Sequence, residues 1–366
     1  MNTPDLPRGT PLSLTGPPRA RGAGQAAQAA RSGVTRAAVA EATLARVSQA
    51  RADGLIDAEA ERYLAAQRDF AETQDPASME ELRGIAEGFG LDLDDLFAHL
   101  HLGILRDLAQ GARADEDGCS ALALVGDDAG PLVAKNRDFA GTHLGVQSVA
   151  RHEGPDIDTG ALLCVGSLGA PGAYSSGMNA AGLVLVDTQV GVRRHRVGWL
   201  RYFLMTRILA TCRTVDDAVR LVRARPHAGG GTLVLADAQG ASAAIELGAE
   251  TVAVERAAPV WRTNHFVSRE LAGDTLPARD DRVAENSRRR FAALEAQLPG
   301  TPPTAAALMR LMAQHADETP HAGPLCQHPA GDDARTISST VYCVADHRLY
   351  FHEGNPCRGD WTHFTL

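Results

Sequence analysis

The chain has 366 residues, a formal net charge of −9 at pH 7 and a sequence isoelectric point near 5.8. This acidic balance argues against a surface that binds nucleic acid or an anionic membrane. No run of 18 apolar residues occurs, so we expect no membrane span, and six dispersed cysteines do not indicate a disulfide scaffold. Because no apolar signal segment opens the chain, we expect a cytoplasmic protein.

The first 118 residues are predicted to be largely helical. Residues 1–24 are rich in Pro, Gly and Arg, and we expect them to form a disordered tail. The stretch that follows is rich in Ala with scattered Arg and Glu, a composition typical of helices. A capping box at residues 78–81 indicates one helix start. Helices are expected at residues 25–50, 56–73, 78–89 and 91–108, and a loop at 111–117.

From Ser120 onward the pattern changes to short apolar runs bounded by turn residues, which indicates β-strands. The first two runs, residues 120–125 and 132–136, flank turn residues and are predicted to form a hairpin. The alternation of strands and paired helices beyond it indicates an α+β fold. Further strands are expected at 161–165, 173–177, 183–188, 231–236, 242–247, 251–255, 337–345 and 349–352, and helices at 198–210, 215–224, 281–297 and 303–315.

A Gly-Cys step lies at the junction between the helical pattern and the strand pattern. The thiolate of Cys119 would be a strong nucleophile. If the chain cuts itself between Gly118 and Cys119, the freed α-amine has a pKa near about 8 and is partly unprotonated at neutral pH. One residue then holds both nucleophile and base, as in N-terminal nucleophile catalysis. The alternative is a buried cysteine that opens a strand.

The predicted hairpin supplies an acidic partner for this cysteine. If the turn is centred between Asp128 and Ala129, Cys119 faces Asp138 across the pair. Directly opposed residues have Cβ atoms about 5 Å apart. A carboxylate there would orient the new amine or hold a proton during cleavage. A slip of one residue in the register would break this pairing.

The motifs Asp-Gly-Cys-Ser at 117–120 and Ala-Lys-Asn-Arg-Asp-Phe at 134–139 resemble those of the isopenicillin N acyltransferase-like family of N-terminal nucleophile hydrolases. The resemblance runs from about residue 25 to the C-terminus. It implies a four-layer αββα sandwich over residues 119–366 and a helical pro-segment over 25–118 that is cleaved off and stays bound as a small chain. Further matching motifs lie at 177–183, 263–266, 325–329 and 349–357.

The same resemblance implies roles for individual residues. Asn264 is similar to the family asparagine that donates a hydrogen bond to the tetrahedral oxyanion, a contribution of roughly 3 kcal/mol. Lys135 stands where related enzymes carry an arginine, and Gln189 stands where they carry a second donor. Arg335 precedes a closing strand and could bind an acidic group or brace Asp138. For each of these four residues a structural role is the alternative.

The implied activity is hydrolysis or transfer of the acyl group of a small linear amide through an acyl-thioester on Cys119. An acyl-coenzyme A-dependent N-acyltransferase is the alternative. No nucleotide-binding motif supports coenzyme A, so we favour hydrolysis and expect no cofactor. The partners expected are a small-molecule amide or acyl thioester and the protein's own pro-segment.

Two other classes of protein compete with this interpretation. A zinc site is conceivable, but the spacing of the candidate ligands fits neither paired CxxC knuckles nor HExxH on one helix, so we predict no metal site. A non-catalytic binding protein is also conceivable, but Cys119, Asp138 and Asn264 together argue against it. The candidate zinc ligands are His315, His321, Cys326, His328 and His352.

Overall fold

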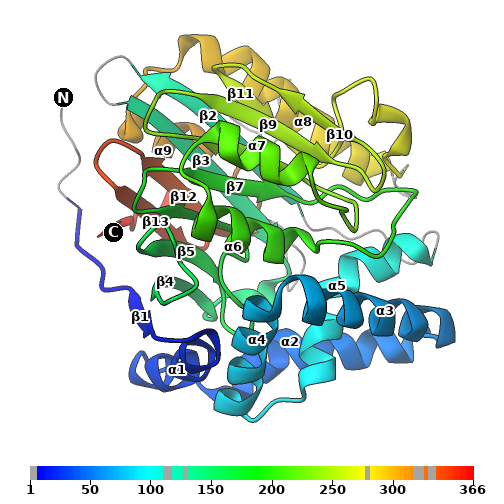
Figure 1. The fold of residues 1–366 in the computed structure, drawn as a ribbon. Helices are drawn as coiled ribbons and strands as arrows, with labels where there is room; N and C mark the ends of the chain where they lie inside the picture. Colours follow the sequence, from blue (N-terminus) through cyan, green and yellow to red (C-terminus); the bar gives the residue numbers. More distant parts are fainter. Residues whose placement is uncertain (1–5, 110–117, 127–129, 277–280, 316–324, 329–334) are drawn as a thin grey trace.

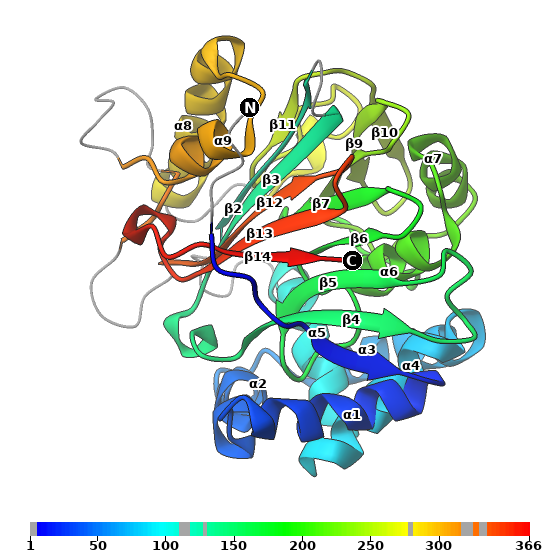
Figure 2. The same ribbon diagram turned by 90° about the vertical axis from the view of Figure 1, so that its left-hand side faces the viewer.

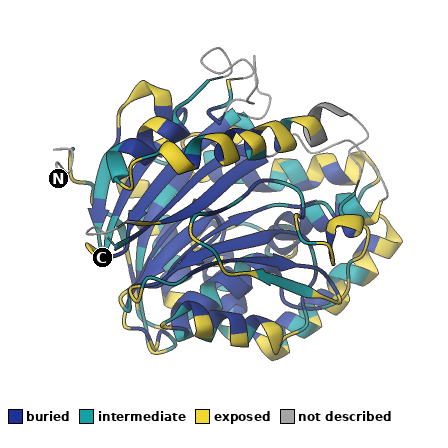
Figure 3. Cartoon of the chain, turned by 90° about the horizontal axis from the view of Figure 1, so that it is seen from above, coloured by how far each residue is buried: buried dark blue, intermediate teal, exposed yellow. Residues whose placement is uncertain are grey.

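The computed structural model describes residues 6–109, 118–126, 130–276, 281–315, 325–328 and 335–366. Within these residues two β-sheets stack face to face, and helices cover their outer faces (Figures 1 and 2). Figure 3 shows the consequence for burial, because the strands between the helix layers are almost entirely buried and the helices expose only their outer sides.

The smaller sheet has the strand order β11-β2-β3-β12-β13-β14, and every pair in it is antiparallel. β2 lies between β3 and β11, so the predicted hairpin is an inner part of this sheet. The bounds are β2 Gly118–Gly126, β3 Gly130–Phe139, β11 Val260–Arg262, β12 Arg335–Cys343, β13 Arg348–Glu353 and β14 Thr362–Thr365.

The larger sheet has the order β1-β4-β5-β6-β7-β8-β9-β10. Its pairs are antiparallel except for β1, which runs parallel to β4 at the edge. The bounds are β1 Leu12–Thr15, β4 Gln147–Glu153, β5 Leu162–Ser167, β6 Ser176–Asn179, β7 Val184–Thr188, β8 Thr232–Ala236, β9 Ser242–Leu247 and β10 Val252–Glu255.

Three apolar layers hold this stack together. Between the sheets, Ala121 and Val133 of the smaller sheet pack in one cluster with residues of the larger sheet such as Val186. The helices α6 (Arg201–Thr211) and α7 (Val215–Arg223) cover the outer face of the larger sheet. The helices α8 (Asp281–Gln297) and α9 (Ala305–Met312) cover the smaller one. The order helix, sheet, sheet, helix confirms the predicted αββα sandwich.

Five helices form a separate block beneath the sandwich, drawn blue to cyan in Figure 1. Most of their buried apolar residues belong to the same cluster as α6, α7 and the outer face of the larger sheet, and a smaller apolar cluster between α2 and α5 lies within the block itself. This block confirms the predicted helical character of the chain before Cys119. The bounds are α1 Pro18–Arg31, α2 Arg36–Ala52, α3 Ala58–Gln74, α4 Pro76–Phe89 and α5 Leu93–Leu108.

The disordered tail expected over residues 1–24 differs from the structure, which describes this range from residue 6. β1 pairs with β4 and buries Leu14, and α1 begins at Pro18. Arg21 is buried and donates hydrogen bonds to both oxygens of Asp156 and to Glu81. Composition alone could not show this order, because it depends on a sheet edge and a carboxylate pair supplied by distant parts of the chain.

The predicted register of the first hairpin is wrong by one residue. Gly118 faces Asp138, and Cys119 faces Arg137. The paired ends of the strands are Gly126 and Gly130, which leaves three residues in the connection and not the even number that the prediction assumed. Those three residues, 127–129, lie outside the described part of the chain.

Four strands were not predicted: β1, β4, β11 and β14. All are at or near sheet edges and are short or polar, so their sequences carry little strand signal. Among the helices that the structure describes, none combines the length and apolar composition needed to cross a bilayer.

The close contact between α1 and α4 predicts how substitutions of the α1 glycines change the free energy of unfolding. A Cβ added at Gly22 would overlap the carbonyl oxygen of Glu81, so Gly22→Ala must force the two helices apart. We expect it to lower the free energy of unfolding by about 1–3 kcal/mol, measured by denaturant titration. Gly24→Ala, on the same helix, places its Cβ 3.6 Å from Leu14, an ordinary contact, and should stabilise by up to about 1 kcal/mol. Equal effects of the two substitutions would mean that α1 does not pack on α4 in this way.

Candidate active site

Cys119 is the second residue of β2 and lies at the wall of a cavity of about 50 Å³. The residue is 8% exposed. The cavity lies between the sheets and the helical segment, since its wall combines residues of β2, β3 and β7 with residues of α2, α5 and α6. A nucleophile placed here is shielded on one side by the sandwich and on the other by α5.

Asn264 binds the backbone of Cys119 directly. The Cys119 N–H donates to Oδ1 of Asn264 at 2.9 Å, and Nδ2 of Asn264 donates to the carbonyl oxygen of Gln189 at 2.8 Å. Asn264 reaches this position because it comes two residues after β11, whose Arg262 pairs with Ala121 of β2. Sheet pairing therefore brings together two residues that are 145 positions apart.

Arg290 of α8 completes the same contact and was not predicted. Its side chain is buried and donates to the carbonyl oxygen of Cys119, to Oγ of Ser120 at 3.0 Å and to Oδ1 of Asn264 at 2.7 Å. Burial lowers the pKa of Arg290, and the carboxylate of Asp138 and the thiol of Cys119 oppose this effect. In the sequence Arg290 ends a run of three arginines, which is typical of a solvent-exposed helix face, so no pattern distinguished it.

Asp138 lies beside the bond that precedes Cys119. A Cβ on Gly118 would be only 3.2 Å from Oδ2 of Asp138 and 3.1 Å from a guanidinium nitrogen of Arg290. Two donors hold the carboxylate: Gln327 Nε2 at 2.8 Å and Thr336 Oγ1 at 2.7 Å. Burial raises the pKa of Asp138, with the charge of Arg290 acting in the opposite direction. The shifted register thus still places the carboxylate at the Gly118–Cys119 step, opposite the glycine.

Lys135 lines the cavity and belongs to a buried ion cluster. Its ammonium group donates to the carbonyl oxygen of Ser175 at 3.1 Å and pairs with Asp187, whose second oxygen accepts from Nε of Arg201 at 2.7 Å. Burial alone would raise the pKa of Asp187, but the two cations hold it below its usual range. Asp187 was missed although a lone carboxylate in an apolar strand is a signal, because buried charges need partners.

The thiol of Cys119 responds to both burial and this ion cluster. Burial raises the pKa of Cys119, and the charge of Lys135 is the largest effect that lowers it. Lys135 thus makes the thiolate less costly than burial alone would.

Most of the predicted site residues come together. Gly118, Cys119, Asp138, Lys135 and Gln189 all line the cavity, and Asn264 contacts Cys119 from outside its lining. The side chain of Gln189 accepts a hydrogen bond from Arg201. Arg335 is not among the described residues that line the cavity. Arg335 begins β12 opposite Phe139. The side chains that donate to Asp138 are Thr336, the next residue in the chain, and Gln327.

Of the five zinc ligands considered from the sequence, the structure groups three. His315, Cys326 and His328 lie together, joined by Cys357, at a place distinct from the cavity wall. His352 is not part of this group, and His321 lies outside the described residues.

Comparison with solved structures finds distant similarities of fold. Two forms of the conjugated bile acid hydrolase from Clostridium perfringens, a mutant and a variant, are 12% and 14% identical to this chain, with TM-scores of 0.44 and 0.45. Each alignment covers 64% of this chain and 89% of that enzyme. Penicillin V acylase from Agrobacterium tumefaciens is 15% identical, with a TM-score of 0.40, and the alignment covers 64% of this chain and 83% of the acylase.

A search of curated proteins finds no match. The family of acyl-coenzyme A:6-aminopenicillanic acid acyl-transferase matches residues 125–358, a range that begins six residues after Cys119 and takes in Lys135, Asp138 and Asn264. Because this match covers more than half of the chain, the protein belongs to the acyl-coenzyme A:6-aminopenicillanic acid acyl-transferase family.

Proposed function

We propose that this protein is a self-cleaving enzyme that hydrolyses or transfers the acyl group of a small linear amide through a thioester on Cys119. The observation that carries the proposal is the placement of Cys119, with Asn264 bonded to its nitrogen and Asp138 beside the preceding glycine, at the wall of a cavity. Membership of an acyl-transferase family supports the same class of chemistry.

In the maturation step, Sγ of Cys119 attacks the carbonyl carbon of Gly118. The Gly118–Cys119 C–N bond breaks, a thioester forms, and the leaving nitrogen takes up a proton. Water then opens the thioester, which leaves a carboxylate on Gly118 and a free amine on Cys119. Burial raises the pKa of Asp138, which favours a carboxyl that can hold the proton needed by the leaving nitrogen.

In turnover, the thiol of mature Cys119 attacks the substrate carbonyl while its own amine carries the proton. Oδ1 of Asn264 is held by the Cys119 nitrogen and by Arg290, which orients the amide group. One N–H of Nδ2 donates to Gln189, so the second remains to bind the oxyanion. Such a donor contributes roughly 3 kcal/mol to the stability of the transition state.

Among the described residues that line the cavity, the cations Lys135, Arg137 and Arg201 outnumber the carboxylates Asp138 and Asp187, and this charge favours a substrate with an anionic group. An acyl-coenzyme A donor also carries negative charge, so this feature does not separate hydrolysis from acyl-coenzyme A-dependent transfer. The helix α5 supplies part of the wall, and we propose that the cleaved pro-segment stays bound through the shared apolar core. The charged residues of the wall are Arg46, Arg106, Lys135, Arg137 and Arg201 against Asp138 and Asp187.

Self-cleavage is tested by the intact mass of the purified protein under denaturing conditions. We expect two chains, the larger beginning at Cys119, because the nucleophile and its carboxyl neighbour meet at that bond. Cys119→Ala should remain a single chain, whereas Cys212→Ala, the same change at a buried cysteine outside the cavity, should be cut normally. A full-length single chain with full activity would rule the maturation step out.

Asp138→Asn is expected to slow this cleavage by about a hundredfold or more, since the amide cannot supply a proton to the leaving nitrogen. The fraction of cut chain is followed over time by gel and mass, with circular dichroism as the check on folding. Asp346→Asn makes the same change in an exposed turn and should cleave at the normal rate. Normal processing of the Asp138 variant would remove this residue from the mechanism.

The acyl-thioester is tested with mature enzyme, a panel of N-acyl amines with and without a carboxylate, and matching acyl-coenzyme A thioesters. Acid-quenched samples should show the acyl mass on the peptide that begins with Cys119. Competition by added amine indicates transfer, and release of free acid alone indicates hydrolysis. Undiminished turnover by a Cys119→Ala chain produced with the mature N-terminus would defeat both mechanisms.

A further inference from the structure

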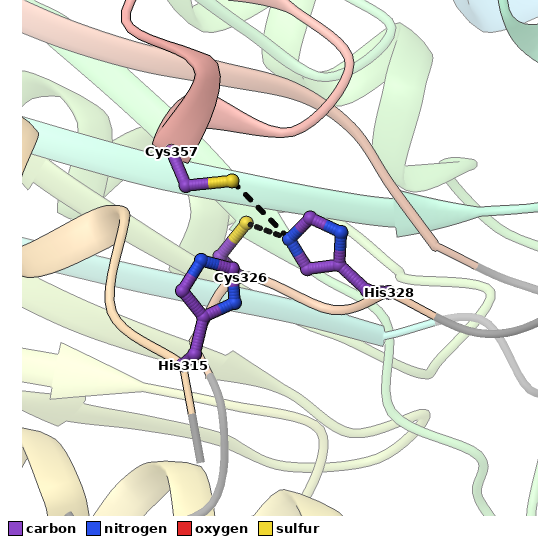
Figure 4. Close-up of side chains that lie close together, drawn as sticks. All are labelled: His315, Cys326, His328 and Cys357. Carbon is purple, nitrogen blue, oxygen red and sulfur yellow. Dashed lines mark hydrogen bonds between the residues drawn. The ribbon is translucent and has the colours of Figure 1, made fainter. Parts of the chain in front are cut away.

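Four side chains of metal-ligand type meet at the surface of the sandwich, away from the cavity (Figure 4). His315 follows α9, Cys326 and His328 lie in the described segment 325–328, and Cys357 lies in the short helix η5 (Pro356–Arg358). Their ligand atoms all lie within 4.8 Å of one another. Three segments that are distant in the sequence therefore present two imidazoles and two thiols to one point.

We propose that His315, Cys326, His328 and Cys357 form a tetrahedral zinc site. In such a site the Zn–S distance is about 2.3 Å and the Zn–N distance about 2.0–2.1 Å, which places sulfur and nitrogen about 3.5 Å apart. Nε2 of His328 lies 3.2 Å from Sγ of Cys326 and 3.3 Å from Sγ of Cys357. These two distances are thus already near the spacing that the ion requires, and all four donor atoms lie within 4.8 Å of one another.

The donor set fits zinc and a structural role. Two thiolates neutralise the charge of Zn²⁺, and two imidazoles complete four-coordination without a position for water, as in structural sites. Cys326 is buried and its sulfur accepts a hydrogen bond from Nδ2 of Asn355 at 3.4 Å, the kind of outer contact that orients a ligand. His328 and Cys357 are exposed, which leaves the ion a path from solvent.

The proposed zinc site is linked to the candidate active site by Gln327, which lies between the ligands Cys326 and His328. Gln327 donates from Nε2 to Oδ2 of Asp138 at 2.8 Å. Its backbone is held as well, because its N–H donates to Oγ1 of Thr336 at 2.9 Å and its carbonyl oxygen accepts from Asn355 at 2.6 Å. An ion bound by Cys326 and His328 would fix both neighbours of Gln327, so zinc positions the side chain that holds Asp138.

The spacing rules applied to the sequence excluded zinc because no CxxC or HExxH pattern occurs. The cluster is assembled from the residues after α9, the segment before β12 and η5. Only Cys326 and His328 are close in the sequence, as a Cys-x-His pair. The two thiols also define the competing chemistry, since an oxidant such as dissolved dioxygen could take two hydrogens from Cys326 and Cys357 and leave a disulfide.

The test is the metal content of untagged full-length protein purified from zinc-supplemented cells. Zinc is measured by inductively coupled plasma mass spectrometry. We expect about one zinc per chain and, after exchange with cobalt(II), the visible absorption of tetrahedral cobalt thiolate. His328→Asn and Cys357→Ser should lower the zinc content at least about tenfold. His347→Asn, the same change at a histidine outside the cluster, should keep it.

Chelation provides a second measurement that needs no variant. Removing zinc from the wild-type chain under reducing conditions should lower its thermal unfolding midpoint, and adding Zn²⁺ back should restore it. Gln327→Ala should keep its zinc yet slow cleavage at Gly118–Cys119, which separates the ion from its link to Asp138. The metal content does not depend on cleavage, so failure of the proposed function would leave this result unchanged.

Three outcomes would overturn the zinc site. The first is reduced wild-type protein that neither contains zinc nor takes it up when Zn²⁺ is added. The second is zinc content that is the same in the His328 and Cys357 variants as in wild type. The third is native protein in which Cys326 and Cys357 form a disulfide, detected as a mass two hydrogens lower in the joined peptides.

Discussion

The pairing of β2 with β3 on one side and β11 on the other is the constraint on which the rest of the candidate site depends. It sets Gly118 opposite Asp138 and carries Asn264 to the backbone of Cys119. Because both faces of the smaller sheet are covered, this register cannot slip without moving apolar side chains from one buried layer to the other. The geometry at Cys119 is therefore held by the same packing that holds the fold.

Charges buried between the layers are compensated within small clusters. Asp187 is paired with Lys135 and Arg201, and the carboxylate of Asp138 is the main charge that acts on Arg290, whose N–H groups also donate to Cys119 and Asn264. Removing one member of such a cluster leaves an uncompensated buried charge, which costs more than the loss of a surface pair. These contacts keep the cavity polar inside a structure that is otherwise closed by apolar residues.

The helical segment is part of the same body as the sandwich. α4 and α5 share an apolar cluster with α6 and the outer face of the larger sheet, and Arg21 of α1 pairs with Asp156 from the loop after β4. α5 also supplies part of the cavity wall. A segment with these contacts has a role in shaping the cavity as well as in covering it. On the opposite side, Gln327 connects Asp138 to the His and Cys cluster.

The sequence by itself determined the helical start of the chain and the strand-rich remainder, because these depend on local periodicity. Its short motifs pointed to Cys119, Asp138 and Asn264, which the structure brings close together. Tertiary structure decided the rest. The order of residues 6–24 depends on a sheet edge and on carboxylates far along the chain. Arg290 acquires its role only when α8 packs on β2, and Cys357 meets His315 only when η5 closes beside α9. The hairpin register depends on the number of residues that connect the two strands. An odd number, three here, shifts the register by one residue relative to an even number, and the strand pattern does not reveal which one occurs. Contacts between distant segments are set by packing, and no local pattern records them.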